Sequence, residues 1–152
     1  MIKNYFIDGN NVIGKSSQLK RLQKNNPQES REKFLLHVEK YFYQKKVSVN
    51  LYFDGFMKSA LASSKIKIIY SDRKTADELI REDISKAKNP RTICLVSSDL
   101  ELIDFARKNS CKIIKSEEFL SDSDKKISDA EKENFEQIIS KTEMLRLFGV
   151  KE

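Results

Sequence analysis

Short apolar runs alternate along this chain with longer amphipathic segments. Five runs rich in Ile, Val, Leu, Phe and Tyr are predicted to be strands, at residues 3–7, 47–53, 66–70, 92–97 and 112–115. Apolar residues at helical spacing predict helices between them, over 29–44, from a Thr75 cap to Asn89-Pro90, and over 100–108. This alternation predicts an α/β fold with a central parallel sheet and helices on both faces.

Two polar stretches interrupt the pattern. Residues 15–28, rich in Lys, Gln, Asn and Ser, are predicted to be a long connection, and residues 121–126 form a second polar segment. Ser128 and Glu131 offer a capping box for a last helix over about 128–149, ended by Gly149. We expect the apolar residues of that helix to pack on the sheet, with packing on a second copy, as a homodimer, as the alternative.

Length and composition favour one domain over residues 1–152, with its core in about 1–120. No apolar run approaches the roughly 20 residues that cross a bilayer, so we expect no membrane association and a cytoplasmic location. Cys94 and Cys111 lack metal-type spacing and are expected to be buried, reduced thiols. The net charge of +6 favours an anionic partner such as nucleic acid.

Four aspartates follow or lie close behind predicted strands. Asp8, Asp54 and Asp99 directly follow apolar runs, and Asp77 lies in the Thr75-Ala76-Asp77-Glu78 segment behind the third run. Because the carboxyl ends of parallel strands meet at one edge of a sheet, we expect these carboxylates to converge. Oxygen ligands of this kind suit Mg²⁺ or Mn²⁺. The pattern therefore predicts an acidic metal site suited to phosphodiester hydrolysis.

Within this site Asp8, Asp77 and Asp99 are the predicted metal ligands. Asp54 is the fourth catalytic candidate, which could bind directly, act through water or cap a turn. Predicted substrate contacts are polar or cationic residues near the same edge: Asn11, Thr75, Ser98, Arg31 and Lys15. The two hydroxyl residues are equally well explained as helix caps. Further candidates for phosphate contacts are Arg73, Lys74 and Arg81.

Four motifs, in this order, carry a family resemblance over about residues 1–120. They are Ile7-Asp8-Gly9-Asn10-Asn11-Val12-Ile13, Tyr52-Phe53-Asp54-Gly55, Thr75-Ala76-Asp77-Glu78-Leu79-Ile80 and Val96-Ser97-Ser98-Asp99. The chain resembles the NYN group of the PIN-like nuclease superfamily, especially the bacterial YacP-type NYN proteins.

This resemblance implies a PIN-like three-layer fold with strand order 3-2-1-4-5. It also implies a divalent-metal ribonuclease whose acidic residues match Asp8, Asp77 and Asp99, with Asp54 matching the strand-two motif. RNA is the implied partner, and ribosome or RNA-processing partners are expected as well. The chain departs from the family pattern at Asn10, where relatives often have Tyr, and at Arg81, where they often have Glu.

Other functions are weighed against an endoribonuclease. An RNA-binding or ribosome-associated scaffold with weak or no catalysis is the main alternative, and DNA cleavage stays open because phosphate contacts do not identify the sugar. A HAD-type phosphatase would need an acid at Asn10, and the order of the acidic motifs does not fit a response-regulator receiver. The only histidine, His37, lies inside a predicted helix without a nucleophile elbow, and no Walker-type loop is present.

Overall fold

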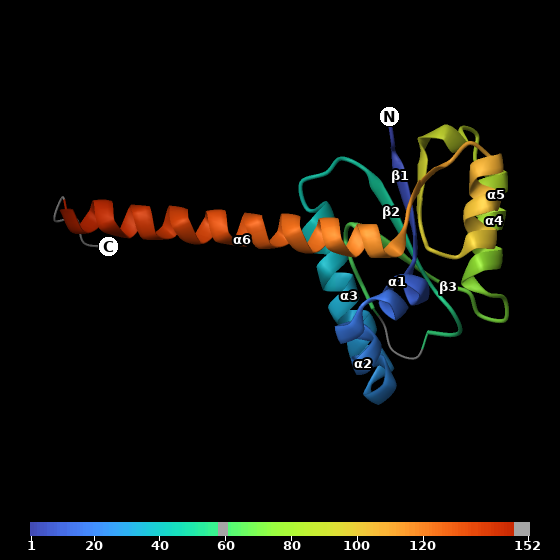
Figure 1. Cartoon of the computed structure of the whole chain (residues 1–152), viewed down its shortest axis with the longest axis horizontal. Helices are drawn as coiled ribbons and strands as arrows, with labels where there is room; N and C mark the ends of the chain where they lie inside the picture. Colours follow the sequence, from blue (N-terminus) through green and yellow to red (C-terminus); the bar gives the residue numbers. More distant parts are fainter. Residues whose placement is uncertain (58–60, 148–152) are drawn as a thin grey trace.

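Five parallel strands form the centre of the protein in the computed structural model, which describes residues 1–57 and 61–147 (Figure 1). They lie side by side in the order β3-β2-β1-β4-β5, and every neighbouring pair is parallel. The predicted fold class and strand order are therefore confirmed. In chain order the strands are β1 (Asn4–Asp8), β2 (Ser48–Phe53), β3 (Ile66–Tyr70), β4 (Ile93–Val96) and β5 (Lys112–Ile114).

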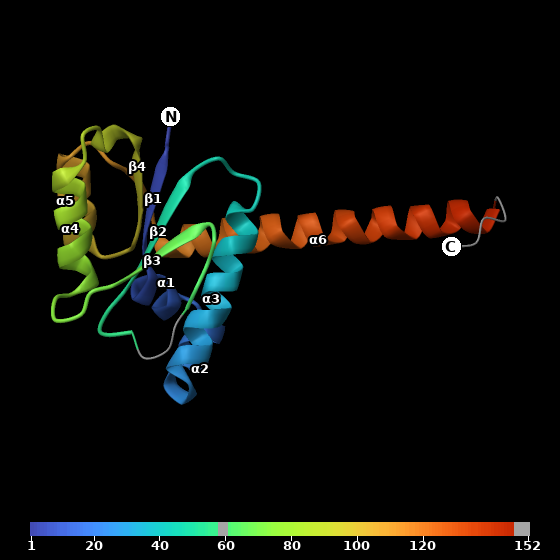
Figure 2. The same ribbon diagram turned by 180° about the vertical axis from the view of Figure 1, so that it is seen from behind.

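Helices cover both faces of this sheet (Figures 1 and 2). One face carries α4 (Ala76–Lys86) and α5 (Leu100–Lys108), and the other carries α1 (Gly9–Lys15), α3 (Pro27–Phe42) and the start of α6 (Ser116–Leu147). Successive strand residues point to opposite faces. Phe6 accordingly belongs to the core under α4 and α5, whereas Ile7 belongs to the core under α3.

The polar stretch at 15–28 is helical, so the predicted long connection is wrong. It contains the end of α1, all of α2 (Ser17–Asn25) and the start of α3. Ser16 caps α2 by accepting the Leu19 N–H at 3.2 Å, and Asn26 caps α3 by accepting the Glu29 N–H at 3.1 Å. Leu19, which is partly buried, packs against the core and attaches this charged helix to it. Pro27 begins α3 at a position where its missing N–H is harmless.

The predicted capping box of α4 is confirmed. Thr75 accepts the Glu78 N–H at 3.1 Å, and the Glu78 carboxylate accepts the Thr75 N–H at 3.4 Å. The helix ends at Lys86, slightly before the predicted Asn89-Pro90 stop, where a short 3₁₀ turn, η1 (Pro90–Thr92), leads into β4.

The last helix begins at Ser116 rather than near Ser128, so its predicted start is wrong and the polar residues 121–126 lie inside the helix. Phe119 is buried in the core, and the Tyr41 hydroxyl donates to the Asp122 carboxylate at 2.9 Å, which favours helix in this segment. His37, partly buried on α3, shares a 2.7 Å hydrogen bond with the Ser123 hydroxyl. Ser128 therefore lies inside α6 and caps nothing, and the predicted terminator Gly149 lies outside the described residues.

The second half of α6 projects away from the sheet (Figures 1 and 2). The expectation that its apolar residues pack on the sheet is wrong, because they are largely exposed: Phe135 63%, Ile138 64%, Ile139 42%, Met144 56% and Leu147 83%. Within the described residues no helix has the length and apolar character needed to cross a bilayer. Cys94 and Cys111 are buried and free, as predicted.

Candidate acidic active site

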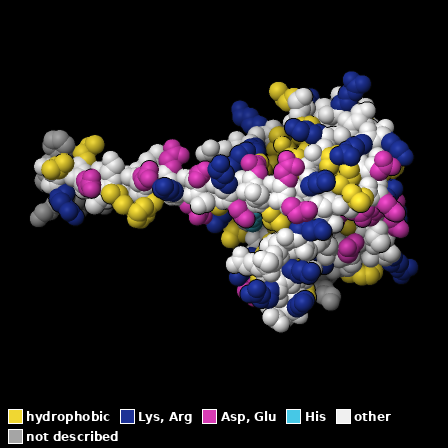
Figure 3. All heavy atoms as spheres, viewed as in Figure 1, with side chains coloured by type: hydrophobic (Ala, Val, Ile, Leu, Met, Phe, Trp, Pro, Cys, Tyr) yellow, Lys and Arg dark blue, Asp and Glu magenta, His cyan; other side chains and the backbone are white. Residues whose placement is uncertain are grey.

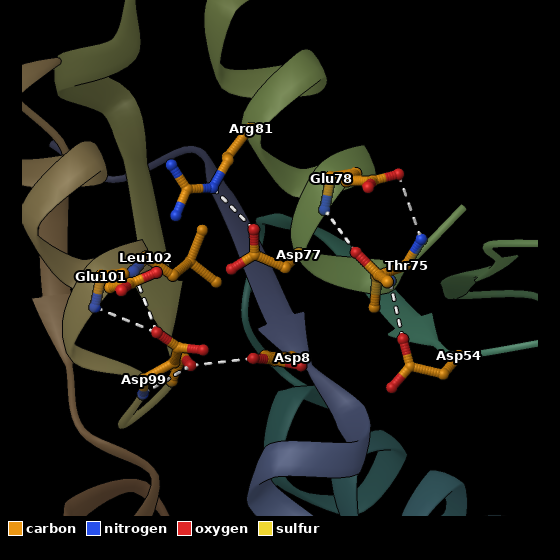
Figure 4. Close-up of polar contacts among 11 residues, drawn as sticks. Asp8, Asp54, Thr75, Asp77, Glu78, Arg81, Asp99, Glu101 and Leu102 are labelled. Atoms are coloured by element: carbon orange, nitrogen blue, oxygen red, sulfur yellow. Dashed lines mark hydrogen bonds and ion pairs between the residues drawn. The ribbon is translucent and has the colours of Figure 1, made fainter.

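Four aspartates meet at the carboxyl edge of the sheet, as the strand pattern predicts (Figure 4). Asp8 ends β1, Asp54 directly follows β2, and Asp99 lies three residues beyond the end of β4. These strands are neighbours, with Asp8 paired in register with Tyr52 and Ile7 with Val96. Asp77 comes from the first turn of α4. Four separate elements thus bring carboxylates to one place.

Asp8 lies at the centre of this group and is only 8% exposed. Burial is the largest cause of a pKa that is raised to about 6, because a desolvated carboxylate is costly. A hydrogen bond from Ser97 lowers this pKa, whereas the nearby charges of Asp54, Asp99 and Asp77 raise it. The charges of the other three aspartates therefore reach the buried Asp8 carboxylate.

Ser97 joins two of these aspartates. Its hydroxyl donates to Asp8 Oδ2 at 2.9 Å and accepts the backbone N–H of Asp99 at 3.2 Å. The Ser97 side chain is fully buried, so the hydroxyl is held in this bridging position. Asp99 in turn caps α5, because its Oδ1 accepts the N–H groups of Glu101 and Leu102 at 3.0 and 3.1 Å. Its orientation is therefore set by the helix end.

Asp54 connects the end of β2 to α4. Its carboxylate accepts the Ala76 N–H at 2.7 Å, and its own N–H donates to the Asn10 side-chain oxygen at 2.8 Å. Asn10, where the chain departs from the family pattern, is thus the residue that positions Asp54. The predicted use of Asp54 as a turn cap is close to what the structure contains, since one of its oxygens caps a helix.

Asp77 is the one aspartate of the four that forms an ion pair among the described residues. Asp77 Oδ1 lies 2.6 Å from Nε of Arg81, one helical turn further along α4, and both side chains are about one-third exposed, at 33%. The Arg81 guanidinium also lies over the Phe105 ring of α5, 5.1 Å from its centroid, which is within the range of about 6 Å for a cation–π contact. A fixed cation therefore borders the acidic edge (Figure 4).

Gly9 explains how Asp8 can sit so close to β2. A Cβ atom at this position would lie 2.5 Å from the Tyr52 carbonyl oxygen and 2.7 Å from the Phe53 ring. No side chain fits in that space, so the Asp-Gly pair lets α1 begin directly against the neighbouring strand. The close approach places the buried carboxylate at the sheet edge.

Asn11 and Ser98 hold the loop that carries Asp99. The Asn11 side-chain oxygen accepts the Ser98 N–H at 2.9 Å and the Ser116 hydroxyl at 2.7 Å. The Ser98 hydroxyl donates to Glu117 and accepts the Ser116 N–H at 2.9 Å. Both residues lie near the site, and the contacts within the chain tie the loop after β4 to the start of α6.

The other predicted substrate contacts lie in different settings. Thr75 caps α4, close to Asp54 (Figure 4). Arg31 lies over the Phe53 and Tyr70 rings at 5.0 and 5.8 Å, and donates to the Asp54 carbonyl oxygen at 3.1 Å. Lys15 lines a pocket of about 410 Å³ with residues of α2, α3 and α6, which includes none of the four aspartates. The structure therefore brings Arg31 into contact with Asp54 and places Thr75 directly before Ala76, whose N–H the Asp54 carboxylate accepts, whereas Lys15 lines a separate pocket.

Sequence comparison agrees with this geometry. The profile of the YacP-like NYN domain matches residues 5–147, nearly the whole chain. The protein belongs to the YacP-like NYN domain family. NYN domains are a family of PIN-like nucleases, so the predicted family membership is confirmed. No match was found among curated protein sequences.

Solved structures of YacP resemble this NYN domain in fold. A crystal structure of the W164L mutant of Rae1 (YacP) from Bacillus subtilis has a TM-score of 0.77 and 23% identity, with 91% of this chain and 85% of that chain covered. A second crystal structure of Rae1 from the same organism has a TM-score of 0.74 and 20% identity, with 96% and 87% covered. At these identities the likeness shows a common fold.

The donor set of this NYN domain suits a hydrated divalent ion. Over residues 1–57 and 61–147, no three His, Cys, Asp or Glu side chains are placed together as a ready cluster for a metal. Mg²⁺ commonly binds one or two carboxylates directly and keeps waters in its other positions, so a closed cage is not required. The buried Asp8, surrounded by other carboxylates, is the feature that a cation would stabilise.

Two neighbours of the site were missed in the sequence. Ser97 is part of the Val96-Ser97-Ser98-Asp99 motif, and its position directly after a buried strand was a usable signal. Glu117, which accepts the Ser98 hydroxyl, had no such signal because the start of α6 was predicted elsewhere. The hydrogen bond from Ser98 holds the pKa of Glu117 below its ordinary value.

Proposed function

We propose that this NYN domain is an endoribonuclease that hydrolyses RNA phosphodiester bonds with the help of Mg²⁺ or Mn²⁺. The observation that carries this proposal is the convergence of Asp8, Asp77 and Asp99 at the carboxyl edge of the sheet, with Asp8 buried and its pKa raised to about 6. Membership of a nuclease family gives the reaction class, and the carboxylate cluster supports the metal.

Asp8, Asp77 and Asp99 are the proposed ligands, with Asp54 as the fourth acidic residue of the site. A bound divalent ion would supply an activated water and polarise the phosphoryl group. The protein's own residues orient the ligands: Ser97 holds Asp8, the α5 end holds Asp99, and Asn10 positions the backbone of Asp54. Such fixed carboxylates need no rearrangement when the reaction begins.

The basic residues give the substrate its proposed electrostatic attraction. The chain carries a net charge of +6, so we propose that its cations bind the phosphates flanking the scissile bond while the scissile bond faces the aspartates. In Figure 3 the Lys and Arg side chains are spread over the visible face of the globular part. The predicted substrate contacts are still Asn11, Thr75, Ser98, Arg31 and Lys15.

The proposal is tested by cleavage of end-labelled single-stranded and structured RNAs with Mn²⁺, Mg²⁺ or EDTA. We expect metal-dependent products from the wild type, and their loss in Asp8→Asn and in Asp99→Asn. The matched control is Asp104→Asn, which should cleave normally. Asp104 lies on α5 and its side chain is 65% exposed. A folded wild type that binds RNA without yielding products would instead favour the scaffold function.

We further propose that the projecting part of α6 pairs with the same segment of a second copy. Residues 129–136 contain four carboxylates and one Lys, whereas 141–146 contain two cations and one carboxylate, so antiparallel helices would place unlike charges together. The apolar side chains on this part of α6 are exposed in Figure 3. A ribosome or RNA-processing partner stays a prediction.

A further inference from the structure

Arg81 introduces a positive charge into a site that is otherwise built from carboxylates. Its Nε lies 2.6 Å from Asp77 Oδ1, and this contact is both a hydrogen bond and an ion pair. The carboxylates of the other three aspartates accept hydrogen bonds from uncharged donors, which are the Ser97 hydroxyl and backbone N–H groups. Among the residues that the structure describes, Asp77 is thus the one proposed ligand that is paired with a cation of the chain.

The Arg81 side chain is held from two sides. Asp77 binds its Nε, and the Phe105 ring lies 5.1 Å from the centre of its guanidinium. Asp77 and Arg81 lie on α4, whereas Phe105 lies on α5, so the packing of two helices keeps the cation at the acidic edge. An Arg side chain stays protonated at every pH at which a protein is folded. The charge at this position is therefore permanent.

We infer that Arg81 limits the acidic site to one divalent ion, by occupying one oxygen of Asp77 with a cation that belongs to the protein. This inference rests on the proposed function and specifies the metal content of the same site. A second ion held by Asp77 would have to displace the guanidinium from Oδ1 and remain beside its positive charge. Asp8 and Asp99, whose partners are uncharged, are the carboxylates left for the first ion, together with the second oxygen of Asp77.

Arg81 is thus a positioning residue, which acts on the metal through Asp77. An ordinary (i, i+4) ion pair would stabilise only its own helix. The chain contains such a pair in Asp104 and Lys108, 3.0 Å apart on α5, with side chains 65% and 75% exposed. Lys108 lies at the opposite end of α5 from Asp99, so its loss removes a helix ion pair without touching the acidic edge.

The experiment counts bound Mn²⁺ by equilibrium dialysis with metal analysis, in the wild type, Arg81→Gln, Arg81→Glu and Lys108→Gln. We expect one ion in the wild type and in Lys108→Gln. Arg81→Gln should bind a second ion, and its first ion about tenfold more tightly, because a competing unit charge is removed and no carboxylate is added. Arg81→Glu should bind two ions. Far-ultraviolet circular dichroism and urea unfolding establish that each variant is folded before its ions are counted.

Two ions in the wild type, or one ion in the wild type and in Arg81→Gln alike, would overturn the inference. RNA cleavage is measured on the same samples, which separates this inference from the proposed function. Cleavage by a wild type that holds two ions would uphold the nuclease and reject the role of Arg81. One ion in the wild type and two in Arg81→Gln, without any RNA cleavage, would uphold the role of Arg81 and reject the nuclease. A wild type that binds no ion would reject both.

Discussion

Ser97 donates its hydroxyl hydrogen to the Asp8 carboxylate at 2.9 Å, although the two residues are 89 positions apart in the chain. The same hydroxyl accepts the Asp99 N–H, so one buried side chain holds both aspartates. A donor of this kind favours the ionised carboxylate and lowers its pKa. Ser97 is therefore expected to control the charge state of Asp8.

Ser97→Ala should raise the pKa of Asp8 above the value of about 6 in the metal-free protein. The reason is the loss of the one hydrogen bond that stabilises this buried charge. Carbon-13 NMR titration of the aspartate carboxyl groups measures the change directly. Ser30→Ala removes another fully buried serine hydroxyl, which donates to the Leu19 carbonyl, and should leave the Asp8 titration unchanged. An unchanged Asp8 pKa in Ser97→Ala would contradict the bridging role.

Asp8→Asn should stabilise the metal-free protein at pH 7.5 while it abolishes cleavage. The folded pKa of about 6 lies above the ordinary value of 3.8, so the ionised carboxylate costs stability as the pH rises through this window. The gain should be about 1–3 kcal/mol at pH 7.5 and should disappear below about pH 4, where Asp8 is protonated in both states. Urea unfolding in EDTA at both pH values checks this.

The matched control for that prediction is Asp104→Asn, because Asp104 is an exposed aspartate on α5. Its stability should change little between the two pH values. If Asp8→Asn is less stable than the wild type at pH 7.5, the ionised Asp8 carboxylate does not destabilise the folded protein as expected. Added Mn²⁺ should stabilise the wild type and not Asp8→Asn, since a ligand that binds only the folded state raises its stability.

Gly9→Ala should destabilise the fold by about 2 kcal/mol, because the added methyl group overlaps neighbours that cannot move easily. The nearest is the Tyr52 backbone oxygen, 2.5 Å from the position of the new Cβ. Gly14→Ala is the control on the same helix, since no atom lies within 4 Å of its Cβ position. Alanine should there leave stability unchanged or raise it by up to about 1 kcal/mol. Urea unfolding of both variants tests the pair.

Ile138→Lys should prevent the proposed pairing of α6. The side chain is 64% exposed in the single chain and belongs to a group with Phe135 and Ile139. We expect a dimer for the wild type and a monomer for the variant in size-exclusion chromatography with light scattering. Ser140→Lys adds the same charge at an exposed position between these apolar residues and the helix end, and should leave the dimer intact. A monomeric wild type would refute the pairing.

The local sequence pattern predicted secondary structure correctly where a segment has one strong signal. The strands near β1, β2 and β3 and the capping box of α4 were all predicted, because apolar runs and the Thr75–Glu78 spacing are local properties. The helix α2 was missed because Lys and Gln dominate it, although Ser16 and Asn26 are ordinary cap residues. The early start of α6 was missed because its stability comes from contacts with α3 that local sequence does not reveal.

The candidate site, like the fold, could be predicted from the sequence only in part. The sequence alone determined that four aspartates would stand at or near strand ends, since strand ends are local and parallel strands share one edge. Only the tertiary structure decided that Asp8 is buried, that Ser97 bridges it to Asp99, and that Arg81 is held at the site between Asp77 and Phe105. Burial, charge interactions and hydrogen bonds depend on distances through space, and those distances exist only once separate segments of the chain have packed together.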